Sequence, residues 1–244
     1  MKKIFACAAL TLGAHSLHAQ SIAAGTVSLG GTVGYSQASS EGSGVRSSAN
    51  GQSQSTSSNS TGKQVYLSPS IGYFVADNLA VGLSLYFGNG MREEDQVLAP
   101  LGIVQHSEMN VKQLRTGAFV QYYKMLNAQF GITGRLGAGY QRLKEDGNGY
   151  TNSNNPPYRY TSSNTSSGYY ADLKPGVIFF PVPKLGLSAS LGDLSFNHYK
   201  LIASSYSDSN GDTFMQGDEN ASNVFSANFG LDTFLLGGTY YFGR

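Results

Sequence analysis

The chain has 244 residues, among them 31 glycines, 16 tyrosines and 13 phenylalanines, and a formal net charge of +1. Its 16 basic residues are balanced by 15 acidic ones, which excludes the strongly basic surface typical of nucleic-acid binding. Glycine and serine favour turns while aromatic residues favour strands, so the composition predicts an all-β chain with long polar loops.

The first residues have the order of a secretory signal peptide. Lys2 and Lys3 precede a short apolar run, and a small residue, Ala19, offers a cleavage point. The run is far shorter than the roughly 20 residues of a membrane-spanning helix, so we expect residues 1–19 to be removed. Cys7, the only cysteine, lies in this segment, and the remaining single domain, residues 20–244, is expected to carry no thiol or disulfide.

The first predicted strand, residues 26–35, has apolar side chains at alternate positions, which is the period of a β-strand. A serine-rich segment, residues 36–61, follows and is predicted to be a loop. Residues 65–87 then form a predicted hairpin that turns near Ala76. One face of this hairpin is apolar and the other carries small or polar side chains.

Further strands are predicted at residues 113–123, 129–141, 169–180 and 185–194, and at the end of the chain. An internal repeat supports them, because shifts of 49 and 106 positions superimpose the apolar and aromatic residues of three hairpins. The chain therefore predicts eight strands with short turns on one side. Four long polar loops would lie on the other side, one of them holding residues 92–95 and 106–108.

Aromatic residues gather beside the predicted short turns, as in the girdle of a membrane-spanning barrel. The girdle is formed by Tyr73, Phe74, Tyr122, Tyr123, Phe179, Phe180, Tyr240, Tyr241 and Phe242. The alternative is a secreted soluble β-sandwich, but the apolar faces carry almost no charges, whereas a soluble sheet normally has one solvated face. We therefore expect an eight-stranded antiparallel up-and-down transmembrane β-barrel.

The chain resembles the small outer-membrane β-barrel family of Gram-negative bacteria, of the OmpA-transmembrane-domain and OmpX type. The most specific match is the terminal strand, which alternates as the family's assembly signal does, at Phe234, Leu236, Gly238, Tyr240 and Phe242. The resemblance implies a monomer in the outer membrane, with the barrel-assembly machinery, lipid and lipopolysaccharide as partners. Residues 225–231 alternate in the opposite phase, which predicts a bulge or strand start near Asp232.

Few charges fall on the inward faces of the predicted barrel. An eight-stranded interior is just wide enough to be filled by side chains, so we interpret these charges, with two tyrosines, as an interior plug. Its members are Tyr66, Tyr86, Arg115, Arg135, Asp172 and Lys174. With equivalent turns, Arg115 and Arg135 would face each other across one ladder, with Asp172 as their partner. A narrow gated pore or a small-ligand site is the alternative.

Other candidates for chemistry lie in the predicted loops. Asp208, Asn210, Asp212 and Glu219 have part of a calcium-loop spacing, although an acidic loop without a metal is favoured. His106, Ser107 and Glu108 are adjacent, but a catalytic triad must converge in space, and sequence neighbours need not. We expect no enzyme, cofactor or metal. Near the loop rim, lipopolysaccharide phosphates could be contacted by Lys112, Arg142, Lys144 and Lys200, although a merely solvated rim is favoured.

The sequence thus predicts an outer-membrane barrel with a closed interior and mobile surface loops, in a structural or surface-interaction role that includes adhesion. A lipid-A-modifying enzyme that uses His106 or His198 is the first alternative. A small gated pore is the second.

Overall fold

The computed structural model describes residues 21–47, 53–99, 102–152, 157–209, 212–216, 221–229 and 235–243, so the predicted signal peptide lies outside the described residues. Every element of the described residues is a β-strand, and all belong to one sheet. No helix in this part of the chain is long and apolar enough to cross a membrane. The strands are β1 (Val27–Ser47), β2 (Ser53–Ala76), β3 (Leu79–Ala99), β4 (Ile103–Met125), β5 (Phe130–Thr151), β6 (Tyr158–Val182), β7 (Leu185–Ser190), β8 (Gly192–Asp208), β9 (Thr213–Gln216), β10 (Ala221–Phe229) and β11 (Leu235–Phe242).

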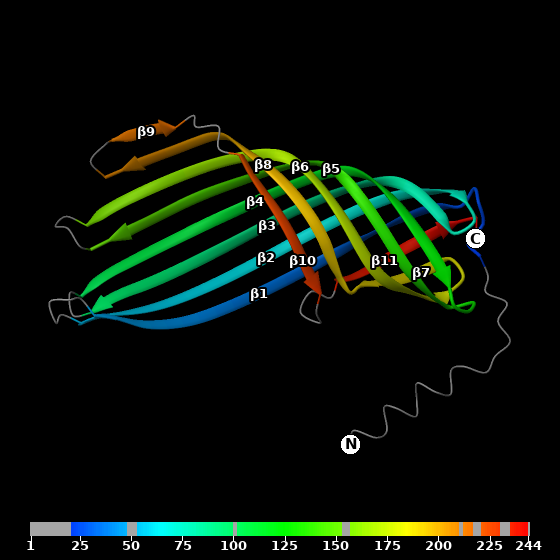
Figure 1. Ribbon diagram of the computed structural model, residues 1–244, viewed down its shortest axis with the longest axis horizontal. Coiled ribbons are helices and arrows are strands. Elements are labelled where there is room, and N and C mark those ends of the chain that lie inside the picture. Colours follow the sequence, from blue (N-terminus) through cyan, green and yellow to red (C-terminus); the bar gives the residue numbers. More distant parts are fainter. Residues whose placement is uncertain are drawn as a thin grey trace, which may run out of the picture.

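Eight of these strands close an antiparallel ring, in the order β1 to β7 and then β11, which pairs with β1. The predicted eight-stranded barrel is therefore confirmed. The hairpin turns β2–β3, β4–β5 and β6–β7 lie at the same end of the barrel as the chain terminus after β11 (Figure 1).

Two predicted strands are interrupted in the structure. Residues 185–194 are divided between β7 and β8 at Gly192, whose φ of 135° is a conformation that favours glycine. The last strand is divided between β10, which ends at Phe229, and β11, which begins at Leu235. The change of alternation in the sequence falls between these two elements, in residues 230–234, which are outside the described ranges.

The ring is closed only in the half of the barrel that carries the short turns. Among the described residues, β1 beyond Thr32 pairs with β2 alone, and β10 pairs with β8 alone. Beyond the ring, β1 to β6 and β8 continue as one curved sheet, with β9 and β10 added along β8 (Figure 1).

The prediction of long polar loops is wrong for most of their residues. The β1–β2 ladder continues in one register from Val27 and Tyr73 to Ser47 and Ser53, through the segment predicted to be a loop. Residues 92–95 and 106–108 likewise lie in β3 and β4. Polar residues can extend a ladder because each added pair satisfies its backbone groups, and the barrel below has already fixed the register.

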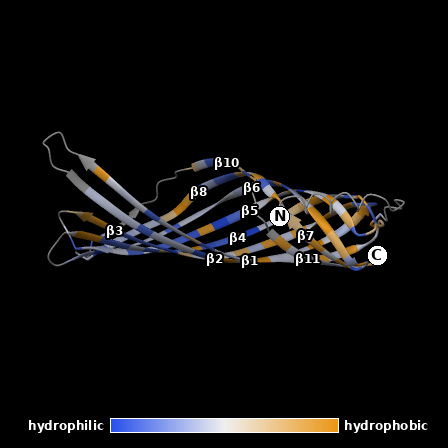
Figure 2. Cartoon of the chain, turned by 90° about the horizontal axis from the view of Figure 1, so that it is seen from below, coloured by the Kyte–Doolittle hydropathy of each residue, from blue (hydrophilic) through white to orange (hydrophobic). Residues whose placement is uncertain are grey.

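The outer face divides into an apolar band and a polar extension. Apolar side chains point outward over residues 27–35 of β1, 79–87 of β3 and 130–140 of β5. These stretches match the roughly 9–11 residues of a membrane-spanning strand. Beyond Tyr35 and Phe87, the outward side chains are mainly polar or charged. Figure 2 shows the resulting contrast, with hydrophobic colours concentrated toward the end that carries the C-terminus.

The apolar core lies inside the barrel, at the short-turn end. We call this cluster the floor, and it consists of Ile22, Phe74, Ala80, Tyr123, Met125, Ile178, Phe180 and Tyr241. Its rings pack closely, with centroids 5.4 Å apart for Phe74 and Tyr123 and 5.2 Å apart for Phe180 and Tyr241. Because adjacent residues point to opposite faces, only alternate members of the predicted aromatic girdle face outward, and the prediction was wrong for the buried four.

The segment before β1 is bound to the floor through the β2–β3 turn. Asn78 adopts a φ of 63°, a conformation that asparagine tolerates better than most residues. Its side-chain oxygen accepts a hydrogen bond of 2.8 Å from the Ile22 backbone N–H, and its own N–H donates to the Ile22 carbonyl at 2.9 Å. These bonds hold the Ile22 side chain, which is fully buried, against the floor.

Candidate functional site

A cavity of about 140 Å³ lies in the lumen directly above the floor. Tyr123, Ile178 and Tyr241 belong both to the floor and to the lining of this cavity. Small residues and hydroxyl side chains on the inward positions of the strands leave the space open. Its hydroxyl lining is formed by Ser28, Thr32, Ser68, Ser70, Thr133, Ser188, Ser190 and Thr239. The interior is therefore incompletely filled at this level.

Arg135 and Lys174 are the two charged residues of the cavity lining. They are directly opposite each other in the β5–β6 ladder. Lys174 Nζ donates a hydrogen bond of 2.8 Å to Asp172, whose side chain is buried. The Arg135 guanidinium lies over the Phe119 ring, 3.8 Å from its centroid. Two cations thus border a cavity whose lining has no carboxylate among the described residues.

Arg115 and Arg135 do not face each other, which corrects the predicted pairing. The β4–β5 register places Arg115 opposite Gln141 and Arg135 opposite Gln121. The prediction assumed a turn centred on Met125, but the ladder ends where Met125 pairs with Gly131, so this turn is longer than the one between β2 and β3. Asp172 forms its ion pair with Lys174, two residues further along β6.

A second polar layer lies above the cavity and contains the other predicted members of the plug. Arg115 donates to Asn197 at 3.4 Å and lies near the rings of Tyr86 and Tyr170, at 5.8 Å and 5.2 Å from their centroids. Tyr66 stacks on Tyr86 with a centroid distance of 5.8 Å. The inward positions of these residues follow from the strand alternation. That they together form a plug stays a prediction.

Sequence reasoning missed Phe119 and the serines that line the cavity. Phe119 occupies an inward position in a strand that was correctly predicted, so its alternation could have identified it as a neighbour of the lumen charges. The serines gave no separate signal. A small side chain on an inward position indicates space only when the facing strands are known.

The extension carries a larger hollow of about 410 Å³ on the inward side of its strands. Four tyrosines line it, Tyr150, Tyr158, Tyr160 and Tyr206, together with the polar residues Glu94, Gln96, Gln105, His106, Ser107 and Thr151. The Tyr158 and Tyr206 hydroxyls are hydrogen-bonded at 2.6 Å, and Tyr160 stacks on Tyr206 with centroids 5.9 Å apart.

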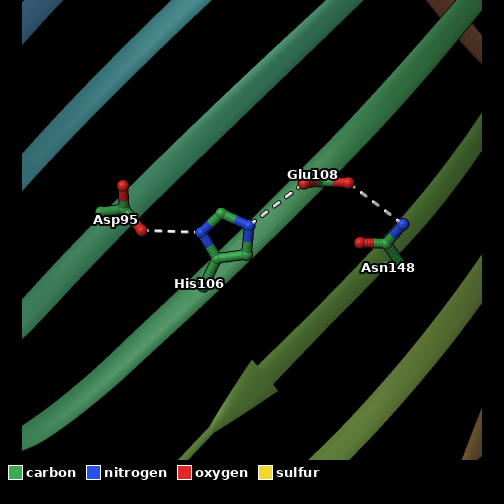
Figure 3. A network of polar contacts seen from close by, with 4 residues as sticks. All are labelled: Asp95, His106, Glu108 and Asn148. Carbon is green, nitrogen blue, oxygen red and sulfur yellow. Dashed lines mark hydrogen bonds and ion pairs between the residues drawn. The ribbon is translucent and has the colours of Figure 1, made fainter.

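His106 belongs to a polar network on the outward face of the extension. Its Nδ1 lies 2.7 Å from Asp95 on β3, its Nε2 lies 3.4 Å from Glu108, and Asn148 on β5 donates to Glu108 at 3.4 Å (Figure 3). His106 and Ser107 both contribute to the lining of the hollow, but as successive residues of β4 they point to opposite faces of the strand. The three adjacent residues therefore do not converge as a nucleophile with its base. His198 contacts Asn223, with 2.9 Å between Nδ1 and Oδ1.

The Asp95 network predicts a pH-dependent charge on His106. The hydrogen bond with Asp95 raises the pKa of His106 above its ordinary value, and Glu108 acts in the same direction. Since the folded pKa lies above the unfolded value of about 6.5, this contribution to stability is full below that pH and is lost as the pH rises through the folded pKa.

We expect Asp95→Asn to return the His106 pKa toward its ordinary value, as measured by a histidine NMR titration with His198→Gln for assignment. Glu93→Gln is the matched control on the same outward face of β3, and a smaller change is expected. A wild-type His106 pKa at or below 6.5 would contradict this assignment.

The proposed calcium spacing is only partly covered by the structure. Asp208 and Asp212 lie at the turn between β8 and β9, where the Asp212 N–H donates to Asp208 at 3.1 Å. Asn210 and Glu219 lie outside the described residues. Within the described ranges, no group of three or more histidine, cysteine or acidic residues is arranged to hold a metal ion.

The four predicted rim cations occupy outward positions just beyond the apolar band. Lys112 lies opposite Lys144, Arg142 lies opposite Ser167, and Ser167 lies opposite Lys200. Lys144 forms an ion pair of 2.9 Å with Asp146. Like charges placed opposite each other in a ladder are unfavourable unless anions screen them. This arrangement is compatible with contacts to phosphates.

The predicted assembly signal lies in β11, apart from Phe234, which is outside the described residues. Leu236, Tyr240 and Phe242 are exposed on the outer face, and Gly238 is in the same alternation. Tyr240 and Phe242 also pack together, with ring centroids 4.8 Å apart. Their role in assembly stays a prediction.

The fold defines the chain as an antiparallel up-and-down β-barrel. No protein-family model and no curated protein matches it. Among solved structures, it is similar to the outer membrane protein OprG from Pseudomonas aeruginosa, with 16% identity and a TM-score of 0.42 over 94% of this chain and 100% of that chain. It is also similar to the outer membrane protease OmpT from Escherichia coli, with 11% identity and a TM-score of 0.30 over 94% of this chain and 99% of that chain.

Proposed function

We propose that this protein is a monomeric outer-membrane β-barrel that presents a rigid sheet beyond the membrane for surface interactions, including adhesion. The observation that carries the proposal is the mismatch between strand length and band height. β1 to β6 have 21 to 25 residues each. A membrane-spanning strand needs only about 9–11 of them.

The size of the extension supports a role in binding rather than simple anchoring. Along β1, the distance from Tyr35 to Ser47 is roughly 40 Å at about 3.3 Å per residue. Such a sheet would hold the hollow with its four tyrosines well away from the lipid. The floor lies at the opposite end and would obstruct passage through the lumen, which favours a binding role over an open pore.

The proposed surroundings account for the charges at the edge of the band. In an outer membrane, Lys112, Arg142, Lys144 and Lys200 would lie at the level of lipopolysaccharide phosphates, which lysine and arginine bind through charge-assisted hydrogen bonds. Assembly would proceed through the barrel-assembly machinery, with β11 as the signal. The separation of His106 and Ser107 onto opposite faces gives no support to the alternative of a lipid-A-modifying enzyme.

Cysteine labelling on intact cells tests this orientation. The mature chain is expected to lack cysteine, so Glu93→Cys introduces one thiol on the outward face of the extension. We expect a membrane-impermeant maleimide to label it on whole cells. Leu83→Cys, in the same strand and on the same face but within the band, is the matched control and should stay unlabelled. Equal labelling of the two variants, or labelling of Glu93→Cys only after lysis, would contradict the proposal.

A further inference from the structure

The cavity above the floor has an unbalanced charge. Arg135 and Lys174 both border it, and they lie opposite each other in one ladder, where two like charges repel. Asp172 attracts Arg135 electrostatically, yet its carboxylate is already bound to Lys174 at 2.8 Å. At this level of the lumen, therefore, one negative charge is available to balance two positive charges.

Arg135 lacks the partners that a guanidinium normally has inside a protein. In the described part of the chain, no hydrogen bond or ion pair links it to another side chain, and its close contact is the face of the Phe119 ring at 3.8 Å. A guanidinium has five N–H donors, and buried charges are usually paired and hydrogen-bonded. The ring covers one face of the group and leaves its donor edge for another ligand.

The remaining lining supplies the rest of an anion site. Eight serine and threonine residues line the cavity together with the two cations, and Ser28 and Thr133 are buried. Hydroxyls can donate hydrogen bonds to an anion, and the described lining has no carboxylate to repel it. The volume of about 140 Å³ is several times the roughly 10–15 Å³ that holds one water molecule on the same measure, which leaves room for a tetrahedral oxyanion.

We propose that this cavity binds one small oxyanion, such as phosphate or sulfate, between Arg135 and Lys174. The anion accepts hydrogen bonds from the Arg135 guanidinium and from the surrounding hydroxyls, and it neutralises the excess positive charge of the lumen. This inference goes beyond the proposed surface role, because it concerns the purified barrel and does not depend on where the extension is exposed.

Isothermal titration of the folded mature chain in non-ionic detergent tests the proposal, with inorganic phosphate against a chloride background of constant ionic strength. We expect one phosphate per barrel and competition by sulfate. Arg135→Met should weaken phosphate binding at least tenfold, because it removes the charge and keeps the apolar stem over Phe119. Arg159→Met, which removes the same charge from an exposed position of β6 far from the cavity, is the matched control and should bind as the wild type does.

A second ligand and a second variant complete the test. Glycerol phosphate represents a lipid headgroup, and it should bind more weakly than inorganic phosphate if the cavity is made for a free ion. If Arg135→Met does not fold, Thr133→Val removes one lining hydroxyl at nearly constant volume and should weaken binding several-fold. No phosphate-specific binding by the wild type, or unchanged affinity in every folded lumen variant, would overturn the proposal.

Discussion

Replacing Phe180 by alanine is expected to lower the free energy of unfolding of the barrel by about 3–5 kcal/mol, the usual cost of truncating a buried phenylalanine. Phe180 is 2% exposed and packs against Tyr241 in the floor. The barrel cannot easily collapse around the lost ring, because strand pairing fixes the width of the lumen. Urea unfolding in phosphatidylcholine vesicles measures the change.

Phe179→Ala is the matched control for this prediction, because the same truncation is made at the next residue. Phe179 points to the outer face and packs against Phe130 with ring centroids 4.6 Å apart. Its loss should remove an aromatic pair worth about 0.5–1.5 kcal/mol and some contact with lipid. If Phe179→Ala were as destabilising as Phe180→Ala, the floor would not be the core of the barrel.

An arginine in the middle of the apolar band is expected to destabilise the folded barrel in lipid. Leu83 is 63% exposed on the outer face of β3, between Val81 and Leu85. Leu83→Arg should lower the free energy of unfolding by about 2–4 kcal/mol, because a cation at the bilayer midplane loses its hydration. The measurement is again urea unfolding in vesicles.

Asn89→Arg is the matched control, because it adds the same charge to the same face of β3 beyond the apolar band. Asn89 is exposed on the same face of β3 but lies beyond Phe87, where the outward side chains become polar. The expected loss is about 0–1 kcal/mol, since an arginine near the interface reaches water. Similar losses for the two variants would show that the band does not contact hydrocarbon.

The barrel itself could be predicted from the sequence because its physical cause is local. Alternation of apolar and small residues specifies which side of each strand faces outward, and the outward positions of Leu83 and Leu136 follow directly. The same rule explains the error in the aromatic girdle. Phe179 and Phe180 are neighbours in the sequence, so they cannot both face lipid.

The extension could not be predicted because its strands lack that signal. The segment between Ser36 and Thr61 has no apolar alternation, and its serine and glycine content is typical of loops. Its strand form depends on the register that the barrel imposes from below, which is a non-local effect. A residue count alone would have indicated only that the connection was long.

The prediction of the candidate site depended on the register between neighbouring strands. An error of a few residues in the length of one turn is enough to change that register. The strand alternation alone gives Arg115 and Arg135 their inward positions, but the predicted pairing of these two residues was wrong because the β4–β5 turn is longer than the repeat suggested. The cavity arises where small residues of several strands meet at one height. Only the assembled barrel brings Ser28, Thr133 and Ser188 together.

The central claim is that the apolar sides of the strands contact hydrocarbon over a band that ends near Phe87 in β3. Single spin labels placed at successive positions from residue 80 to residue 93, in vesicles, test it most directly through their collision rates with oxygen and with a polar nickel complex. We predict that oxygen dominates at Val81, Leu83, Leu85 and Phe87, with a period of two, and that the nickel complex dominates at Asn89 and Glu93. Dominance of the nickel complex at Leu83 and Leu85 would contradict the account.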